Sequence, residues 1–237
     1  MSEPVTTPRP WTVNRPGPLT PRGPDLWTID DDVPGLAGAG RRMTIVRRRD
    51  ETLLFYNAIP LPEETLRAVR ALGSPARLVV PNQFHALDAA AFTLKLNVTP
   101  YAPQVAVTEL EKRFGFSCRP IDELAQDGAL LRFSVEGFRT KECVLLVDGT
   151  LLVADLVTNV AHVPGLMGLV MRFIGFTGPT PKLPKPVRKR VEVDTEAVRT
   201  LLNTLAAQPG LTRLIPSHGE VVETDAPSVL RQVAQTL

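Results

Sequence analysis

Two histidines and one aspartate stand where apolar runs stop. His85 follows "RLVVPNQF", His218 follows "LTRLIPS", and Asp155 follows "TLLVA". A buried strand needs neither an imidazole nor a carboxylate at its tip, whereas a site built at strand ends can use both. Because an unpaired buried carboxylate is costly, we expect Asp155 to have a partner, which would be a cation, an arginine or backbone donors.

Each candidate also has a purely structural interpretation. His218 would then be a turn histidine that hydrogen-bonds the neighbouring backbone, and His85 a residue at a helix N-terminus. Asp155 would accept backbone N–H groups at a strand-to-loop junction. Asp88 is either a further ligand or a solvated residue in the first turn of its helix. His162 opens an apolar stretch and is expected to cap or pack a helix rather than bind a metal.

The elements that must position these residues alternate between strands and helices. In the first half, β-branched and aromatic runs and helical periodicity predict a strand at 26–32, a hairpin at 41–59 turning at 49–51, a helix at 61–73, a strand at 76–81 and a helix at 85–96. In the second half they predict a helix at 107–115, a strand at 129–137, a hairpin at 142–157, a helix at 162–176, a helix at 194–208, a strand at 211–217 and a helix at 225–237.

Three local signals support these elements. Asp148-Gly149 between two apolar runs is a hairpin turn pair. Asp194 and Asp225 are the expected N-caps of the last two helices.

Composition excludes several classes of protein. The 237 residues are 43% hydrophobic and 22% charged, and 27 Lys and Arg against 25 Asp and Glu give a formal charge of +2. No overall field therefore attracts nucleic acid or a membrane surface, and any basic partner surface would have to be local. The two cysteines, Cys118 and Cys143, lack ligand spacing and favour a reduced, cytoplasmic protein. The sequence shows no signal peptide, and its longest apolar patch, 163–176, is shorter than the ~20 residues of a spanning helix.

Prolines mark the expected organisation. Many of the 23 prolines lie in residues 4–24 and 178–190. Because proline fixes φ and removes a donor, both stretches are expected to be extended and poor in regular structure. We therefore expect a loose proline-rich arm at 1–24, a domain at 25–237 and a basic surface loop at 178–190.

Three motifs in this order resemble the metallo-β-lactamase-like superfamily: "RLVVPNQFHALD", "TLLVADLV" and "LIPSHGE". Within it they are similar to a branch with a degenerate metal-binding motif, whose members carry an "RMTIVR" strand, a "VPNxxH" motif and an "ADL" motif. The resemblance covers residues 25–235 and implies an α/β fold, a four-layered αββα sandwich with a site along the edge between its two sheets.

The resemblance also implies ligands. Asp155 falls on the superfamily's bridging aspartate and His218 on its last histidine, while the HxHxDH motif is reduced to His85 and Asp88. Phe138 stands where a further ligand is usual. His85, Asp155 and His218 would form a His₂Asp set, enough for one zinc or iron ion but not for two.

Such a site implies a mono-metal hydrolase of a small ester, thioester or phosphoester. The alternative is a non-catalytic binding or scaffold protein that kept the fold and lost the metal. A third option, RNA processing, rests on the basic segments around 41–49 and 182–190. We consider nucleic acid an unlikely partner, because strand alternation puts Arg42 and Arg48 on one face and Arg47 and Arg49 on the other, with no interleaved aromatic residues.

Overall fold

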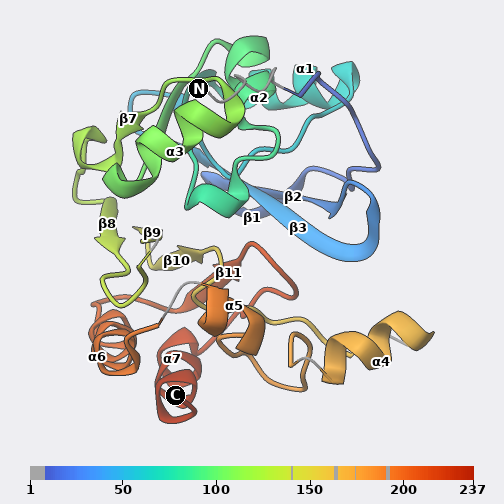
Figure 1. Ribbon diagram of the computed structural model, residues 1–237. Coiled ribbons are helices and arrows are strands. Elements are labelled where there is room, and N and C mark those ends of the chain that lie inside the picture. Colours follow the sequence, from blue (N-terminus) through green and yellow to red (C-terminus); the bar gives the residue numbers. More distant parts are fainter. Residues whose placement is uncertain (1–8, 140, 163–164, 174, 191–192) are drawn as a thin grey trace. The chain divides into compact units, whose positions relative to one another are not determined.

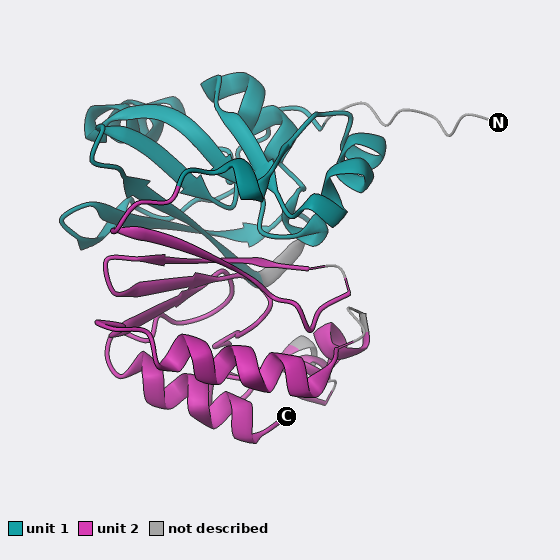
Figure 2. Cartoon of the chain, turned by 90° about the vertical axis from the view of Figure 1, so that its left-hand side faces the viewer, with its two compact units in different colours: residues 1–125 teal, residues 126–237 magenta. Residues whose placement is uncertain are grey.

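The computed structural model describes residues 9–139, 141–162, 165–173, 175–190 and 193–237 (Figure 1). The chain forms two compact units, residues 1–125 and residues 126–237, which Figure 2 shows in different colours. Each unit contains one sheet and its own helices. The expected α/β class with two helix-flanked sheets is therefore confirmed.

The sheet of residues 1–125 has its strands in chain order, from β1 to β7. Its strands are β1 Thr20–Gly23, β2 Leu26–Val33, β3 Leu36–Arg47, β4 Thr52–Tyr56, β5 Ser74–Val79, β6 Thr99–Ala102 and β7 Arg119–Pro120. The pairs from β1 to β4 are antiparallel and those from β4 to β7 are parallel. The carboxyl ends of β4, β5 and β6 consequently share one edge of this sheet.

The predicted hairpin in residues 41–59 is confirmed as β3 and β4. Thr44 pairs with Tyr56 and Arg47 with Leu53, and the turn between them closes with a hydrogen bond from the Arg48 N–H to the Thr52 carbonyl, 2.8 Å. In this turn, hydrogen bonds from the Thr52 side chain and backbone hold the pKa of Asp50 below its usual value. The polar break in the sequence is therefore a turn, as predicted.

Helices follow the parallel strands, as the alternating pattern predicts. They are α1 Glu63–Leu72, α2 Ala89–Leu96 and α3 Gln104–Phe114. Helix α1 begins after Pro62 and ends at Gly73, whose added Cβ would lie 2.4 Å from the Glu51 carbonyl oxygen, so this close approach needs glycine. The apolar sides of the helices bury a core with the sheet, and its fully buried members include Ile45, Phe55 and Phe92.

The proline-rich arm is better ordered over residues 9–24 than the sequence suggested. Strand β1 pairs with β2, the Asn14 side chain and the Arg15 N–H donate to the Asp31 carboxylate, and Trp11 packs on Phe92 with ring centroids 5.9 Å apart. Prolines are compatible with an edge position because they need not donate to a neighbouring strand. The expectation of a loose arm is wrong for these residues, while the domain boundary at residue 25 stays a prediction.

The sheet of residues 126–237 has the order β11-β10-β9-β8. Its strands are β8 Leu130–Ser134, β9 Cys143–Val147, β10 Thr150–Val153 and β11 Arg213–Pro216. Strand β10 runs antiparallel to β9 and parallel to β11. The predicted Asp148-Gly149 turn is confirmed: both residues have positive φ, 42° and 74°, as this type of two-residue hairpin requires.

The helices of this unit are α4 Gly165–Phe173, α5 Lys185–Arg190, α6 Thr195–Ala206 and α7 Ala226–Gln235. Asp194 caps α6 through the N–H groups of Glu196 and Ala197, and Asp225 caps α7 through Ser228. Both caps are as predicted. The helix expected at 162–176 is confirmed as α4, although residues 163, 164 and 174 lie outside the described part.

One expectation for this unit is wrong. Residues 178–190 are not extended throughout, because α5 begins at Lys185, directly after Pro184. Pro186 lies in its first turn, where the missing N–H has no helical partner to lose. Across the described residues, no helix has the length and apolar character needed to cross a membrane.

Candidate functional site

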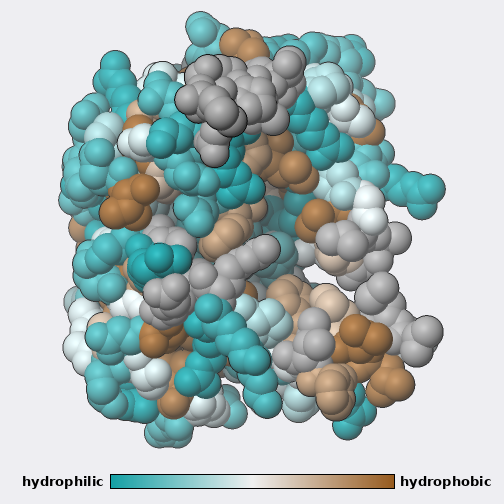
Figure 3. Space-filling view, in the orientation of Figure 1, coloured by the Kyte–Doolittle hydropathy of each residue, from teal (hydrophilic) through white to brown (hydrophobic). Residues whose placement is uncertain are grey.

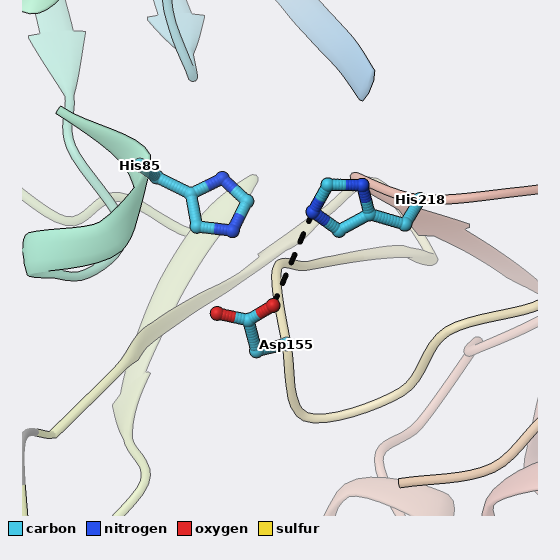
Figure 4. Close-up of side chains that lie close together, drawn as sticks. All are labelled: His85, Asp155 and His218. Atoms are coloured by element: carbon cyan, nitrogen blue, oxygen red, sulfur yellow. Dashed lines mark ion pairs between the residues drawn. The ribbon is translucent and has the colours of Figure 1, made fainter. Parts of the chain in front are cut away.

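Asp155 and His218 are brought together by two neighbouring parallel strands. Val153 of β10 pairs with Pro216 of β11, and each candidate lies two residues beyond its paired residue. Both side chains are largely buried, and His218 Nε2 lies 4.0 Å from Asp155 Oδ1 (Figure 4). This distance is too long for a hydrogen bond. The His218 imidazole and the Asp155 carboxylate therefore face each other without a direct hydrogen bond between them.

The backbone at Asp155 is held by a fully buried carboxylate, Glu142. Its Oε1 accepts the N–H groups of Ala154 (2.9 Å) and Leu156 (3.3 Å), and its Oε2 accepts the N–H of Asp155 (2.8 Å). Three successive amide donors converging on one carboxylate fix the path of the chain where β10 ends. Glu142 therefore sets the position of Asp155.

The loop that carries His218 is fixed by Asn159. The Asn159 N–H donates to the His218 carbonyl (3.1 Å), and the Glu220 N–H donates to the Asn159 carbonyl (2.8 Å). Between them, Gly219 has φ +91°, and an added Cβ would lie 2.0 Å from the Asn159 carbonyl oxygen. The glycine after His218 is therefore required by both conformation and space. The ring of Phe176 lies edge-on to His218, with centroids 6.4 Å apart.

His85 lies in the other unit, in the short 3₁₀ helix η1 Gln83–His85 that follows β5. The Asn82 side chain caps this turn by accepting the Phe84 N–H at 2.8 Å. His85 Nδ1 lies 3.0 Å from the buried Asn57 amide, which also donates to the Arg42 carbonyl. The ring is thus oriented through Nδ1. The predicted helix at 85–96 begins only at Ala89, so His85 precedes α2.

Asp88 is neither a solvated residue nor suited to be a ligand. Its side chain is fully buried, 2.6 Å from Arg41 and 3.5 Å from Arg9. Arg41 in turn lies 3.6 Å from Asp31. A carboxylate compensated by two guanidinium groups has its charge satisfied without a metal. The expectation of a solvated Asp88 is therefore wrong, and this cluster instead holds the segment after His85 to β3.

The remaining sequence candidates have structural roles. His162 Nδ1 lies 2.8 Å from the Thr177 hydroxyl, in line with a packing role. Phe138 is buried. Of the arginines in the first basic segment, Arg42 pairs with Asp30 at 2.7 Å and Arg47 with Asp25 at 2.6 Å. These pairs reduce the positive charge available to a nucleic acid.

Comparison with known structures gives the fold. A metallo-beta-lactamase FIM-1 from Pseudomonas aeruginosa, solved in its mono-zinc form, is 12% identical and matches with a TM-score of 0.64, over 95% of this chain and 98% of that one. A metallo-beta-lactamase from Pontibacter korlensis is 13% identical with a TM-score of 0.63, over 93% and 99%. One from Erythrobacter litoralis is 13% identical with a TM-score of 0.61, over 92% and 96%.

The chain has the metallo-β-lactamase fold. This confirms the fold implied by the sequence motifs, and the matches extend over both units. Neither a scan against protein-family models nor a search of curated proteins found a match. At 12–13% identity the likeness establishes the metallo-β-lactamase fold and leaves the chemistry to be argued from residues.

Sequence reasoning missed Glu142, whose carboxylate fixes the backbone at the end of β10. A signal was present, because "KECVLLVDG" places an acid directly before an apolar strand of five buried residues. From the sequence, backbone N–H groups were among the expected partners of the Asp155 carboxylate. In the structure those donors bind Glu142, so that the Asp155 side chain is directed to His218 (Figure 4).

Proposed function

We propose that this protein is a mono-metal hydrolase with a degenerate version of the metallo-β-lactamase site, in which His85, Asp155 and His218 hold one zinc or iron ion. The proposal rests chiefly on the facing pair of Asp155 and His218, 4.0 Å apart at the ends of β10 and β11. The three residues together offer two ring nitrogens and one carboxylate oxygen, a set that a metal ion can accept.

The separation of the facing pair fits a shared ion. Two ligand atoms at ~2.1 Å from a tetrahedral zinc lie about 3.4 Å apart. The observed 4.0 Å is about 0.6 Å longer, a difference that small side-chain rotations can close. Glu142 and Asn159 fix the backbone on both sides, so the ligands need little reorganisation.

His85 would complete the ligand set from the other unit. Its Nδ1 is engaged with Asn57, so ligation would use Nε2. A histidine that binds a metal through Nε2 carries its proton on Nδ1 and donates it to an acceptor. In the structure the Asn57 group beside Nδ1 is its NH₂, which also donates to the Arg42 carbonyl, so ligation through Nε2 would require the amide to turn over and give up that bond. We infer that the Asn57 amide sets the orientation of the His85 ring through its contact with Nδ1.

A metal ion bound there would supply a hydroxide-like nucleophile near neutral pH and polarise the bond to be broken. The residues of the chain hold the ion and fix the positions of its ligands. Three protein ligands leave a coordination position for water or substrate, as catalytic zinc sites do. Asp155, whose carboxylate has a second oxygen, can accept a proton from a group beside it. A small ester, thioester or phosphoester is the substrate class that this chemistry serves, in the cytoplasm, where both free cysteines would stay reduced.

Metal analysis of the purified protein tests the proposal. After supplementation with zinc or iron(II), we expect about one equivalent of bound metal per chain. The His218→Ala variant should lose it, because Asp155 would have no facing imidazole, while its helix content stays unchanged. The matched control is His162→Ala, which removes an imidazole bound to Thr177 and should keep the metal. Less than about a tenth of an equivalent in the supplemented native protein would refute the proposal.

Activity distinguishes the hydrolase from the scaffold alternative. Loaded protein is assayed with a p-nitrophenyl ester, an acyl thioester and a phosphodiester, with the His218→Ala variant as the background. Hydrolysis that requires both the metal and His218 supports the proposed function. Metal bound in full with no turnover on any of the three substrate classes favours a metal-binding scaffold, and no metal at all favours a scaffold that has lost the site.

A further inference from the structure

Helix α4 exposes apolar side chains that no element covers in the described part of the chain. Leu169, Val170 and Phe173 are 62%, 45% and 89% exposed. At 100° per residue they span about a 100° arc of the helix, so they share one face. Figure 3 shows hydrophobic atoms gathered at the lower right, where Figure 1 places α4. A contiguous apolar face of this kind marks an interaction surface.

The segment around α4 carries charge of one sign only. Residues 156–191 contain six Lys or Arg and no Asp or Glu, whereas the remaining 21 basic residues of the chain are outnumbered by its 25 acidic ones. The six are Arg172, Lys182, Lys185, Arg188, Lys189 and Arg190. Lys185 and Lys189, both exposed, belong to α5. The chain's net positive charge is therefore concentrated in this segment.

The apolar face and the basic segment are joined locally. The loop after α4 closes with hydrogen bonds from the Gly175 N–H to the Arg172 carbonyl and from the Phe176 N–H to the Met171 carbonyl. A Cβ added at Gly175 would lie 2.9 Å from Lys185 Cδ, so the first residue of α5 packs on this loop. Burial, and after it the neighbouring positive charge of Lys185, lower the pKa of Lys182. An anionic partner would favour the charged form of both lysines.

We propose that α4 and α5 form a docking surface for an anionic lipid membrane, with Leu169, Val170 and Phe173 inserted among the acyl chains and Lys185 and Lys189 on the headgroups. The chain would lie on the membrane surface and would not span it. An apolar helix face beside a cluster of lysines and arginines is the combination that binds anionic bilayers. This inference is independent of the metal.

A single-stranded nucleic acid fits the surface less well. Base stacking needs several aromatic side chains beside the cations, whereas the described side chains of the exposed face are two aliphatic residues and one aromatic residue, Phe173. Aliphatic side chains gain by leaving water for hydrocarbon and gain little from nucleotides. The composition of the face therefore favours lipid.

Flotation of the full chain with lipid vesicles tests the proposal. We expect binding to vesicles of equal parts phosphatidylglycerol and phosphatidylcholine, no binding to phosphatidylcholine alone, and release as salt rises from about 0.05 M to about 0.5 M. The Leu169→Ser/Phe173→Ser and Lys185→Glu/Lys189→Glu variants should each lower the partition coefficient at least about tenfold. All four positions are exposed or lie on an exposed face, so the variants should fold, which circular dichroism checks.

Matched controls are available in the other unit. Leu94 and Val105 are 77% and 54% exposed, and Leu94→Ser/Val105→Ser removes comparable apolar surface elsewhere. Arg67→Glu/Lys112→Glu makes the same change in net charge at exposed helix positions. Equal losses in the controls, equal binding to neutral vesicles, or binding of single-stranded RNA without vesicle binding would each overturn the proposal. Metal content should be unchanged in all four variants, which separates this test from that of the proposed function.

Discussion

Replacing Glu142 by glutamine tests how the site is positioned. The carboxylate accepts three backbone N–H groups with its two oxygens, at 2.9 and 3.3 Å on Oε1 and 2.8 Å on Oε2. Glutamine keeps one acceptor oxygen, which can serve Ala154 and Leu156, but its NH₂ group would face the Asp155 N–H. Two donors would then oppose each other at a fully buried position.

The size of the effect follows from these contacts. A buried donor left without a partner costs about 1–3 kcal/mol, and the other two bonds lose the part of their strength that comes from the charge. We expect Glu142→Gln to lower the free energy of unfolding by about 3 kcal/mol. For a chain of this length that corresponds to a fall in Tm of about 6–12 °C. Because the Asp155 N–H loses its acceptor, metal affinity should fall as well.

Thermal denaturation followed by circular dichroism measures the first effect, and zinc titration at a temperature where both proteins are folded measures the second. Glu136→Gln is the matched control, since this glutamate of the same unit is exposed and pairs with Lys141 at the surface. The control should change stability by less than about 0.5 kcal/mol. A Tm for Glu142→Gln within about 1 °C of the native value would refute the assigned role.

Three further predictions concern other parts of the chain. Asp88→Asn removes the nearer of the two carboxylates beside the buried Arg41, leaving Asp31 at 3.6 Å, and should cost about 2 kcal/mol in a urea denaturation experiment, whereas a solvated Asp88 would give no change. Gly219→Ala places a Cβ against the Asn159 carbonyl at φ +91° and should lower both Tm and metal affinity; native values would contradict the close approach. Burial raises the pKa of Cys118 to about 12, so its alkylation at pH 8 should be about a thousandfold slower than that of a free thiol and should accelerate with pH. Rapid labelling of the folded protein would contradict this.

Local rules predicted the elements that depend on local chemistry. The Asp148-Gly149 turn and the Asp194 cap depend only on neighbouring residues, and both are present. Strands β6 and β7 were missed because Pro100 and Pro120 lie in them, and proline normally argues against a strand. Helix α5 was missed because it lies in a proline-rich stretch that was expected to be extended.

The site was only partly predictable from sequence. The parallel register of Val153 with Pro216 connects segments about sixty residues apart, and motif order was the only sign of it. The role of Asp88 was missed because its partner, Arg41, lies 47 positions away. Charge pairs of this kind leave no periodic pattern in the sequence.

X-ray absorption at the zinc K-edge of the loaded protein tests the central claim most directly, because it counts the ligands by type. We predict four N or O scatterers at about 2.0–2.1 Å, two of them imidazole rings whose outer atoms give their own scattering pattern. One imidazole or none, or a sulfur scatterer at about 2.3 Å, would show that His85 and His218 do not share the ion.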